Sequence, residues 1–391
     1  MGVDAVAAEE LAAIRERGTY RHMRVLEGAQ APRMRVDGRE VLLFAGSNYL
    51  DIAMHPRVVE ASAQAARELG CAAGGSRLIS GNLALHEELE EELAKFLGAD
   101  AALTFGTGYM ANVGVIPALC GRGDVVVSDA LSHASIIDGC RLSRADVRVF
   151  PHGDLDALEQ VLREVSSTHR RVLLAIDGVY SMDGDVAPLA EMLPLARRHG
   201  AMVLLDDAHG TGTLGSSGRG SAELCGVSDS VDIHLGTLGK GLGCFGAFIA
   251  GSRPLRELLV NTARSFIFSC ALAPPQVAAA RAALEVVAEE GWRRTALQEN
   301  SRQLRDGLAN RGISTRPSTT HIVPVQTGSN RRTMAVCQAL LERGFYAQGI
   351  RHPSVPEGTA RLRITPMASH RRDEIDALVA AVSEELERHP A

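Results

Sequence analysis

Apolar residues in the middle of the chain form short runs, and the segments between these runs carry apolar residues at helical spacing. The runs predict buried strands over Ala101–Phe105, Val125–Ser128, Val172–Ile176, Met202–Leu205 and Val231–Leu235. Segments between them, such as Leu155–Val165 and Leu189–His199, predict amphipathic helices. Strands that alternate with helices predict an α/β domain with a mostly parallel sheet and helices on both of its faces.

The two ends of the chain carry different patterns. A short helical pattern lies near the N-terminus, and from about Pro275 helical patterns dominate, with two strand-like runs before a closing helix over His370–Arg388. We therefore predict an N-terminal helix and extension over residues 1–45, a large domain over 46–280 and a smaller C-terminal α+β domain over 281–391.

Composition narrows the class of protein. The 391 residues, 46% of them hydrophobic, are enough for two domains. The formal net charge is −6 and no basic stripe is present, which argues against nucleic acid as a partner. Neither a signal-peptide pattern nor an apolar run of membrane-spanning length is visible. Seven scattered cysteines without a C-x-x-C pair are typical of reduced thiols, so we expect a cytoplasmic protein without a membrane span.

Polar and glycine-rich clusters follow the predicted strands. They are Gly106–Gly108, Asp129–His133, Asp177–Asp183, Asp206–His209 and Thr237–Lys240. Because ligands of parallel α/β sheets bind outside the carboxyl ends of the strands, we expect these clusters to converge on one site.

A carboxylate and a lysine at neighbouring strand ends suit pyridoxal 5′-phosphate chemistry. In such enzymes a lysine forms a Schiff base with the cofactor, and an acid pairs with the pyridine nitrogen so that the ring accepts electrons. Asp206 and Lys240 are the candidates. A nucleotide site would need a P-loop, which the sequence around Lys240 lacks, and a metal site at Asp206 and His209 would lack a third ligand. A buried acid and histidine with a purely structural role remain an alternative.

The glycine turn before residue 110 predicts an anion site. Gly106, Gly108 and Ala111 fit a G-x-G-x-x-A spacing between a strand and a helix, whose N-terminus favours a phosphate. The same spacing, with Asp129 near the end of the next strand, is compatible with a dinucleotide-binding protein. That alternative leaves Asp206 and Lys240 without a role.

Taken together, the motifs resemble those of the α-oxoamine synthases, fold-type I pyridoxal-phosphate enzymes that condense an amino acid with an acyl thioester. The resemblance extends from about Tyr20 to Leu386. It rests on Gly74-Gly75-Ser76-Arg77, Ser132-His133-Ala134-Ser135, Tyr180-Ser181-Met182-Asp183-Gly184-Asp185, Asp206-Asp207-Ala208-His209-Gly210, Thr237-Leu238-Gly239-Lys240 and Gly358-Thr359-Ala360-Arg361-Leu362-Arg363.

The resemblance implies a role for each matching residue. At the cofactor ring, Lys240 forms the Schiff base and moves the Cα proton, Asp206 pairs with the ring nitrogen, His209 bonds the ring hydroxyl and His133 stacks on the ring. The remaining cofactor contacts are assigned to Gly108, Tyr109 and Thr237 at the phosphate and to Ser181 near the hydroxyl.

The resemblance also implies how substrate is held. Arg363 or Arg361, two apart on a predicted strand, binds the substrate carboxylate, and Arg351 and Arg21 are candidates for the acyl-thioester end. Ser47 lies near the region that lines the substrate pocket. The sequence departs from the family's usual pattern at three places. Asp177 stands where glutamate is usual, and Cys270 stands where threonine is common. The segment Ser47-Asn48-Tyr49-Leu50-Asp51 replaces a more usual Asn-Asp-Tyr-Leu-Gly.

The expected reaction is a decarboxylative condensation that releases an α-amino ketone, carbon dioxide and a thiol. The expected substrates are L-alanine and a pimeloyl thioester on coenzyme A or a carrier protein, and the expected assembly is a homodimer with shared active sites. Serine or another small amino acid as substrate, and a catalytically silent scaffold subunit of the same fold, remain alternatives.

Overall fold

The computed structural model describes residues 2–390 and divides the chain into two compact units. The larger unit consists of Ser47–Ser181 and Val186–Thr295. The smaller unit consists of the chain up to Gly46, the short segment Met182–Asp185 and the chain from Ala296 onwards.

Two of the predicted domain boundaries differ from this division. Residues up to Gly46 are not a separate extension but part of the smaller unit, because β3 (Arg39–Leu43) pairs in parallel with β12 (Phe345–Tyr346). The boundary near residue 280 is also displaced. Helix α11 (Pro274–Glu289) packs on α2 (Pro56–Leu69) and α3 (Ala84–Leu97), so it belongs to the larger unit.

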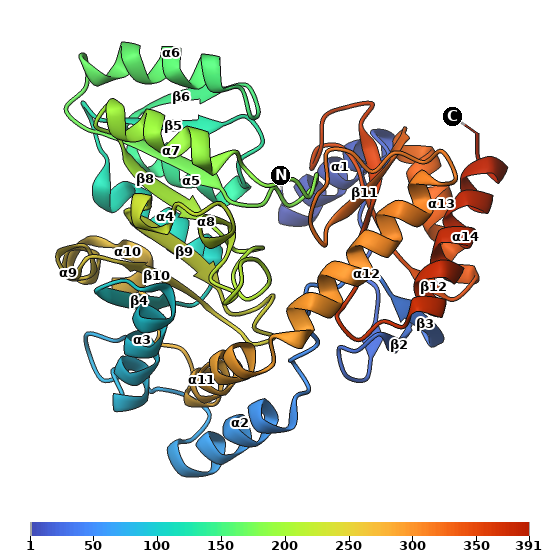
Figure 1. Cartoon of the computed structure of the whole chain (residues 1–391), viewed down its shortest axis with the longest axis horizontal. Helices are drawn as coiled ribbons and strands as arrows, with labels where there is room; N and C mark the ends of the chain where they lie inside the picture. Colours follow the sequence, from blue (N-terminus) through green and yellow to red (C-terminus); the bar gives the residue numbers. More distant parts are fainter. Residues whose placement is uncertain (1, 391) are drawn as a thin grey trace. The chain divides into compact units, whose positions relative to one another are not determined.

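A seven-stranded sheet forms the centre of the larger unit (Figure 1). In spatial order its strands are β4 (Ala101–Phe105), β10 (Ala247–Gly251), β9 (Ile233–Thr237), β8 (Met202–Asp206), β7 (Val172–Asp177), β5 (Val125–Asp129) and β6 (Asp146–Phe150). Strand β10 is antiparallel to both of its neighbours, and the ladders from β9 to β6 are parallel. The sheet is therefore mostly parallel, as the sequence predicts.

Helices cover both faces of this sheet, which makes a three-layer α/β sandwich. Val125 and Val127 pack with α6 (Leu155–Ser166) and α7 (Leu189–Arg198), whereas Val126 packs on the opposite face with α4 (Gly108–Leu119) and α5 (Ala134–Ser143). Because successive strand residues point to opposite faces, a continuous apolar run serves two cores at once. The remaining helices of this unit are α8 (Ser221–Leu224), α9 (Arg253–Thr262) and α10 (Arg264–Ile267), with a 3-10 turn at Ser228–Ser230.

The smaller unit contains two small sheets. One has the order β11 (Val323–Gly328), β14 (Ala360–Ile364) and β13 (Gln348–Ile350), and the other has β1 (Leu26–Glu27), β2 (Arg33–Val36), β3 and β12. Its helices are α1 (Val3–Glu16), α13 (Asn330–Glu342), α14 (Arg372–Arg388) and most of α12 (Trp292–Ala309). Between residues 2 and 390, no helix has the length and apolar character needed to cross a membrane.

Candidate active site

A cavity of about 280 Å³ lies in the larger unit, where loops leave the carboxyl ends of β4, β7, β8 and β9. Seven of the predicted residues line it: Lys240, Asp206, His209, His133, Gly108, Tyr109 and Thr237. The other lining residues are Thr107, Ser135, Asp177, Ala208, Gly239, Phe245 and Gly246. The predicted convergence of strand-end clusters is therefore present in the fold.

Asp206 is a buried carboxylate held by two donors. Strand β8 ends at Asp206, whose side chain is 5% exposed. Asn112 Nδ2 donates to Oδ2 at 2.7 Å, and the backbone N–H of Ala208 donates to Oδ1 at 3.1 Å. These two bonds fix the orientation of the carboxyl group at the cavity.

Lys240 and His209 form the second part of the site. Lys240 Nζ lies 3.1 Å from His209 Nε2, and His209 Nδ1 lies 2.8 Å from the hydroxyl of Tyr49. Within residues 2–390, Lys240 forms no ion pair. This amine is available for reaction at a position set by two neighbouring side chains.

The loop that carries Tyr49 holds Asp51 in a left-handed backbone conformation. The φ angle of Asp51 is 54°. Aspartate tolerates this left-handed conformation better than most residues. Asn48 Oδ1 accepts the N–H groups of Ile52 and Ala53 at 3.0 and 3.2 Å, which fixes the loop beside Tyr49.

The N-terminus of α4 borders the cavity and suits an anion. Thr107 caps this helix by accepting the N–H of Met110 at 3.1 Å. A Cβ added to Gly108 would lie 2.9 Å from Thr237 Cγ2, so the turn has no room for a side chain there. Thr237 Oγ1 donates to Ala208 O at 3.1 Å. Exposed backbone N–H groups at a helix start form a ready phosphate site.

His133 and Asp177 occupy the opposite side of the cavity. The N–H of His133 donates to Asp177 Oδ2 at 2.9 Å. Burial, together with the neighbouring Asp206 carboxylate, raises the pKa of Asp177 well above its ordinary value. The His133 ring is solvent-accessible along the cavity, yet the surrounding protein desolvates it enough to lower its pKa. Burial therefore favours the uncharged form of both groups.

Six predicted residues do not line this cavity. Ser181 and Ser47 belong to the larger unit but are absent from its wall. Arg21, Arg351, Arg361 and Arg363 belong to the smaller unit. On β14, Arg361 forms an ion pair with Asp183, and Arg363 is buried with 8% exposure. Their roles in binding substrate stay predictions.

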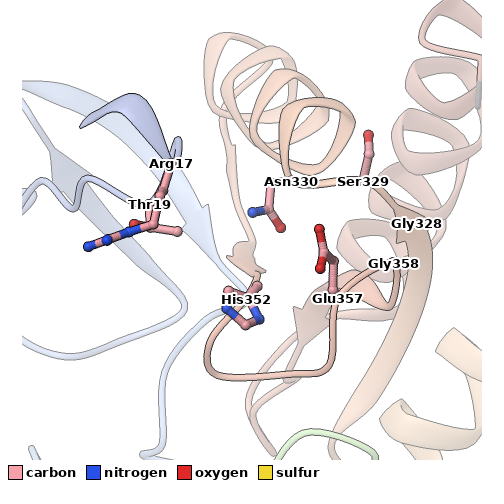
Figure 2. Close-up of a pocket in the computed structure, with 8 residues that line it drawn as sticks. All are labelled: Arg17, Thr19, Gly328, Ser329, Asn330, His352, Glu357 and Gly358. Carbon is pink, nitrogen blue, oxygen red and sulfur yellow. The ribbon is translucent and has the colours of Figure 1, made fainter. Parts of the chain in front are cut away.

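Cavities within the smaller unit are distinct from this site. Arg21 and Arg351 line one of about 320 Å³, where Arg21 donates to Ser354 Oγ at 3.2 Å and Arg351 donates to Tyr20 O. A cavity of about 650 Å³ is lined by none of the predicted residues, and Figure 2 shows Asn330, His352 and Glu357 around it.

Sequence reasoning missed several residues of the site. Tyr49, Asn112 and Ser135 make its buried hydrogen bonds, and Phe245 adds an apolar wall. Asn112 lies one helical turn after Gly108, so a polar residue in an otherwise apolar helix was the available signal.

The residues present fit pyridoxal phosphate. A lysine amine beside His209, a buried carboxyl group held by two donors and a helix N-terminus without side-chain bulk match the aldehyde, ring nitrogen and phosphate of that cofactor. No group of three His, Cys, Asp or Glu side chains suited to a metal ion occurs in the described part of the chain.

Comparison with known proteins supports the same class. Residues 39–382 match the model of the aminotransferase class I and II family, to which the chain therefore belongs. The fold is that of the fold-type I pyridoxal-phosphate enzymes, as predicted.

Relatives narrow the assignment to the α-oxoamine synthases, which confirms the resemblance seen in the motifs. The chain is 50% identical over 377 residues to 8-amino-7-oxononanoate synthase of Geotalea daltonii, covering 96% of each chain. It is 51% identical over 381 residues to the enzyme of the same name from Geobacter sulfurreducens, again covering 96% of each. Among solved structures, serine palmitoyltransferase of Sphingomonas wittichii matches with a TM-score of 0.92 and 34% identity, covering 99% of this chain and 97% of that one.

Proposed function

We propose that the protein is an 8-amino-7-oxononanoate synthase. It condenses L-alanine with the pimeloyl thioester of coenzyme A or a carrier protein and releases an α-amino ketone, carbon dioxide and the free thiol. The observation that carries this proposal is the full-length identity of about half to two enzymes of that name. The arrangement of Lys240, Asp206 and His209 around one cavity supports it.

Pyridoxal phosphate, when bound, supplies an electron sink that stabilises negative charge at the Cα of the amino acid. Asp206, oriented by its bonds from Asn112 and Ala208, would pair with the ring nitrogen and favour its protonated form. Lys240 is the attachment point, and its free amine then takes and returns the Cα proton. His209 holds that amine in place at 3.1 Å.

The other cofactor contacts follow from the cavity wall. We assign the phosphate to the N–H groups of Gly108 and Tyr109 and to Thr237, and the ring face to His133. Ser181 completes the set on the hydroxyl side of the ring.

The α-carboxylate of the amino acid is an anion, so we propose that an arginine of the smaller unit binds it. We assign the α-carboxylate to Arg363, whose guanidinium presents a planar fork to it, with Arg361 as the alternative. Arg351, Arg21 and Ser47 are assigned to the acyl end. The proposal includes a homodimer with shared active sites and a cytoplasmic location.

A serine palmitoyltransferase-like reaction is the second candidate. It is favoured by the similarity of the fold to that enzyme from Sphingomonas wittichii, with a TM-score of 0.92. A silent scaffold is the third candidate, and the presence of Lys240 at the cavity argues against it, because a scaffold has no use for a Schiff-base lysine.

A substrate matrix separates these candidates. Purified protein loaded with pyridoxal phosphate is incubated with glycine, L-alanine or L-serine and with either pimeloyl-CoA or palmitoyl-CoA, and the amino ketone is measured by mass spectrometry. We expect product from L-alanine with pimeloyl-CoA, and none from Lys240→Ala. Preference for serine and palmitoyl-CoA would replace the proposal with the second candidate. No product from any pair would reject both.

A further inference from the structure

A chain of buried hydrogen bonds connects Asp206 to His133 through two residues that have no assigned role. These residues are Asn112 on α4 and Ser135 on α5, with side chains 0% and 1% exposed respectively. Asn112 Nδ2 lies 2.7 Å from Asp206 Oδ2 and 2.9 Å from Ser135 Oγ, and Ser135 Oγ lies 2.7 Å from His133 Nδ1. The polarity of each bond follows from the donors available.

The first bond determined is that of the histidine. His133 caps α5, and its Nδ1 accepts the backbone N–H of Ser135 at 3.3 Å. A ring nitrogen that accepts a proton donor carries a lone pair, so it has no proton of its own. The Ser135 hydroxyl must therefore donate its proton to the same Nδ1. The proton of the neutral imidazole is then on Nε2.

The second bond determined is that of the amide. An asparagine side chain has two donors, both on its nitrogen, and the carboxylate of Asp206 is an acceptor. Asn112 can satisfy Asp206 and the lone pair of Ser135 Oγ together only with Nδ2 facing both. The opposite orientation would place two acceptor oxygens against each other. All protons of the chain are thereby assigned in one direction.

Close packing of α4 and α5 holds this chain together. A Cβ added to Gly139 of α5 would lie 2.9 Å from Asn112 O and 2.9 Å from Ile116 Cδ1. The absence of a side chain there lets the two helices approach closely enough for Asn112 to reach Ser135.

We propose that Ser135 and Asn112 are positioning residues: the Ser135 hydroxyl holds His133 as its Nε2–H tautomer, and the Asn112 amide orients the Asp206 carboxyl group. In the described part of the chain Nε2 of His133 forms no hydrogen bond, so its N–H is available to a ligand in the cavity. The connection to catalysis rests on the proposed function, in which both end residues contact the cofactor. The tautomer of His133 does not depend on the proposed function and can be measured without the cofactor.

The tautomer is measured in cofactor-free protein labelled with ¹⁵N-histidine, by NMR near pH 8, with the His133 signals assigned from His133→Gln. We expect an unprotonated Nδ1 and a protonated Nε2 in the unmodified protein. Ser135→Ala removes the shorter of the two bonds to Nδ1, the hydroxyl at 2.7 Å, and leaves only the backbone N–H at 3.3 Å, so a population with protonated Nδ1 should appear beside the original tautomer. Ser132→Ala is the matched control, because its buried hydroxyl has no hydrogen-bond partner in the described structure. Its His133 signals should match those of the unmodified protein.

Asn112→Ala tests the other half of the chain. The Ser135 hydroxyl still donates to His133, so the tautomer should persist, while Asp206 loses a donor and kcat falls by roughly 10- to 100-fold. This variant also keeps the proposal testable if Ser135→Ala does not fold.

Two results would overturn the proposal for Ser135 and Asn112. One is a protonated Nδ1 in the unmodified protein, and the other is a Ser135→Ala variant with unchanged tautomer and unchanged kcat. Failure of the proposed function is separately visible. A protein with the expected His133 tautomer but no condensation activity would support the positioning role of Ser135 and reject the proposed condensation reaction.

Discussion

Asp207, which follows Asp206 in the sequence, has a buried carboxyl group that packs closely against the backbone of three glycines. Its Oδ2 accepts the N–H of Ser221 at 2.6 Å. A Cβ added to Gly178, Gly210 or Gly220 would lie 2.5, 2.2 or 1.8 Å from one of its carboxylate oxygens. Burial raises the pKa of this carboxyl to about 7, and the nearby Asp206 carboxylate acts in the same direction.

This raised pKa predicts how stability changes with pH. An acid whose pKa is higher in the folded state than its ordinary value of 3.8 binds its proton more tightly when folded. Its contribution is therefore intact below pH 4 and is lost as pH rises towards 7, above which both states are ionised. The whole loss is roughly 4 kcal/mol at about 1.4 kcal/mol per pH unit. Roughly 2 to 3 kcal/mol of it falls between pH 5 and pH 8.

The substitution Asp207→Asn isolates this effect, because asparagine does not titrate and its Oδ1 still accepts the Ser221 N–H. Urea unfolding is followed between pH 5 and pH 8 by the fluorescence of Trp292, the single tryptophan, which belongs to the larger unit. The free energy of unfolding of the unmodified protein should fall relative to the variant by roughly 2 to 3 kcal/mol. Asp100→Asn, at an exposed position, is the control and should show no such trend. A difference between Asp207→Asn and the unmodified protein that is constant over this range would refute the argument from burial.

Three further changes test the cofactor site and the core. Lys240→Ala should release pyridoxal phosphate on dialysis after borohydride treatment, whereas the unmodified protein retains it covalently, and retention by the variant would reject the assignment. Gly108→Ala should weaken cofactor binding roughly 10-fold in a fluorescence titration, because its Cβ would approach Thr237 Cγ2 to 2.9 Å, and unchanged affinity would remove this turn from the phosphate site. Leu162→Ala, in the core on α6, should lower the free energy of unfolding by about 2 to 5 kcal/mol by Trp292 fluorescence, and a smaller loss would mean that the site collapses.

The sequence predicted the parts of the fold in which composition and burial agree. The runs that became β4, β5, β7 and β8 are apolar and buried, so they were visible, although β9 begins and ends two residues later than predicted. The edge strand β6 was missed because four of its five residues are exposed and no apolar run marks them. Strand β10 is apolar and buried but was also missed, and its antiparallel direction depends on its neighbours, which local sequence does not encode.

The candidate site divides in a similar way. Residues with chemically distinctive side chains, such as Lys240 and Asp206, could be predicted from their place after apolar runs. Asn112 was marked only as a polar residue in an apolar helix, and its bond to Ser135 could not be predicted, because that bond depends on a contact between two helices whose spacing is set by packing at Gly139. A hydrogen-bond chain across helices leaves no periodic trace in the sequence.

The pairing of β3 with β12 has a consequence for how the protein is made. Leu42 and Leu43 emerge from the ribosome early, but their partners Phe345 and Tyr346 follow about 300 residues later. At a translation rate of about 5 to 20 residues per second, β12 is synthesised roughly 15 to 60 s after β3. All residues of the larger unit are synthesised within that interval. We therefore expect nascent chains to form the α/β sandwich first. Until translation ends, the antiparallel pair of β2 and β3 has an unpaired edge that chaperones can bind.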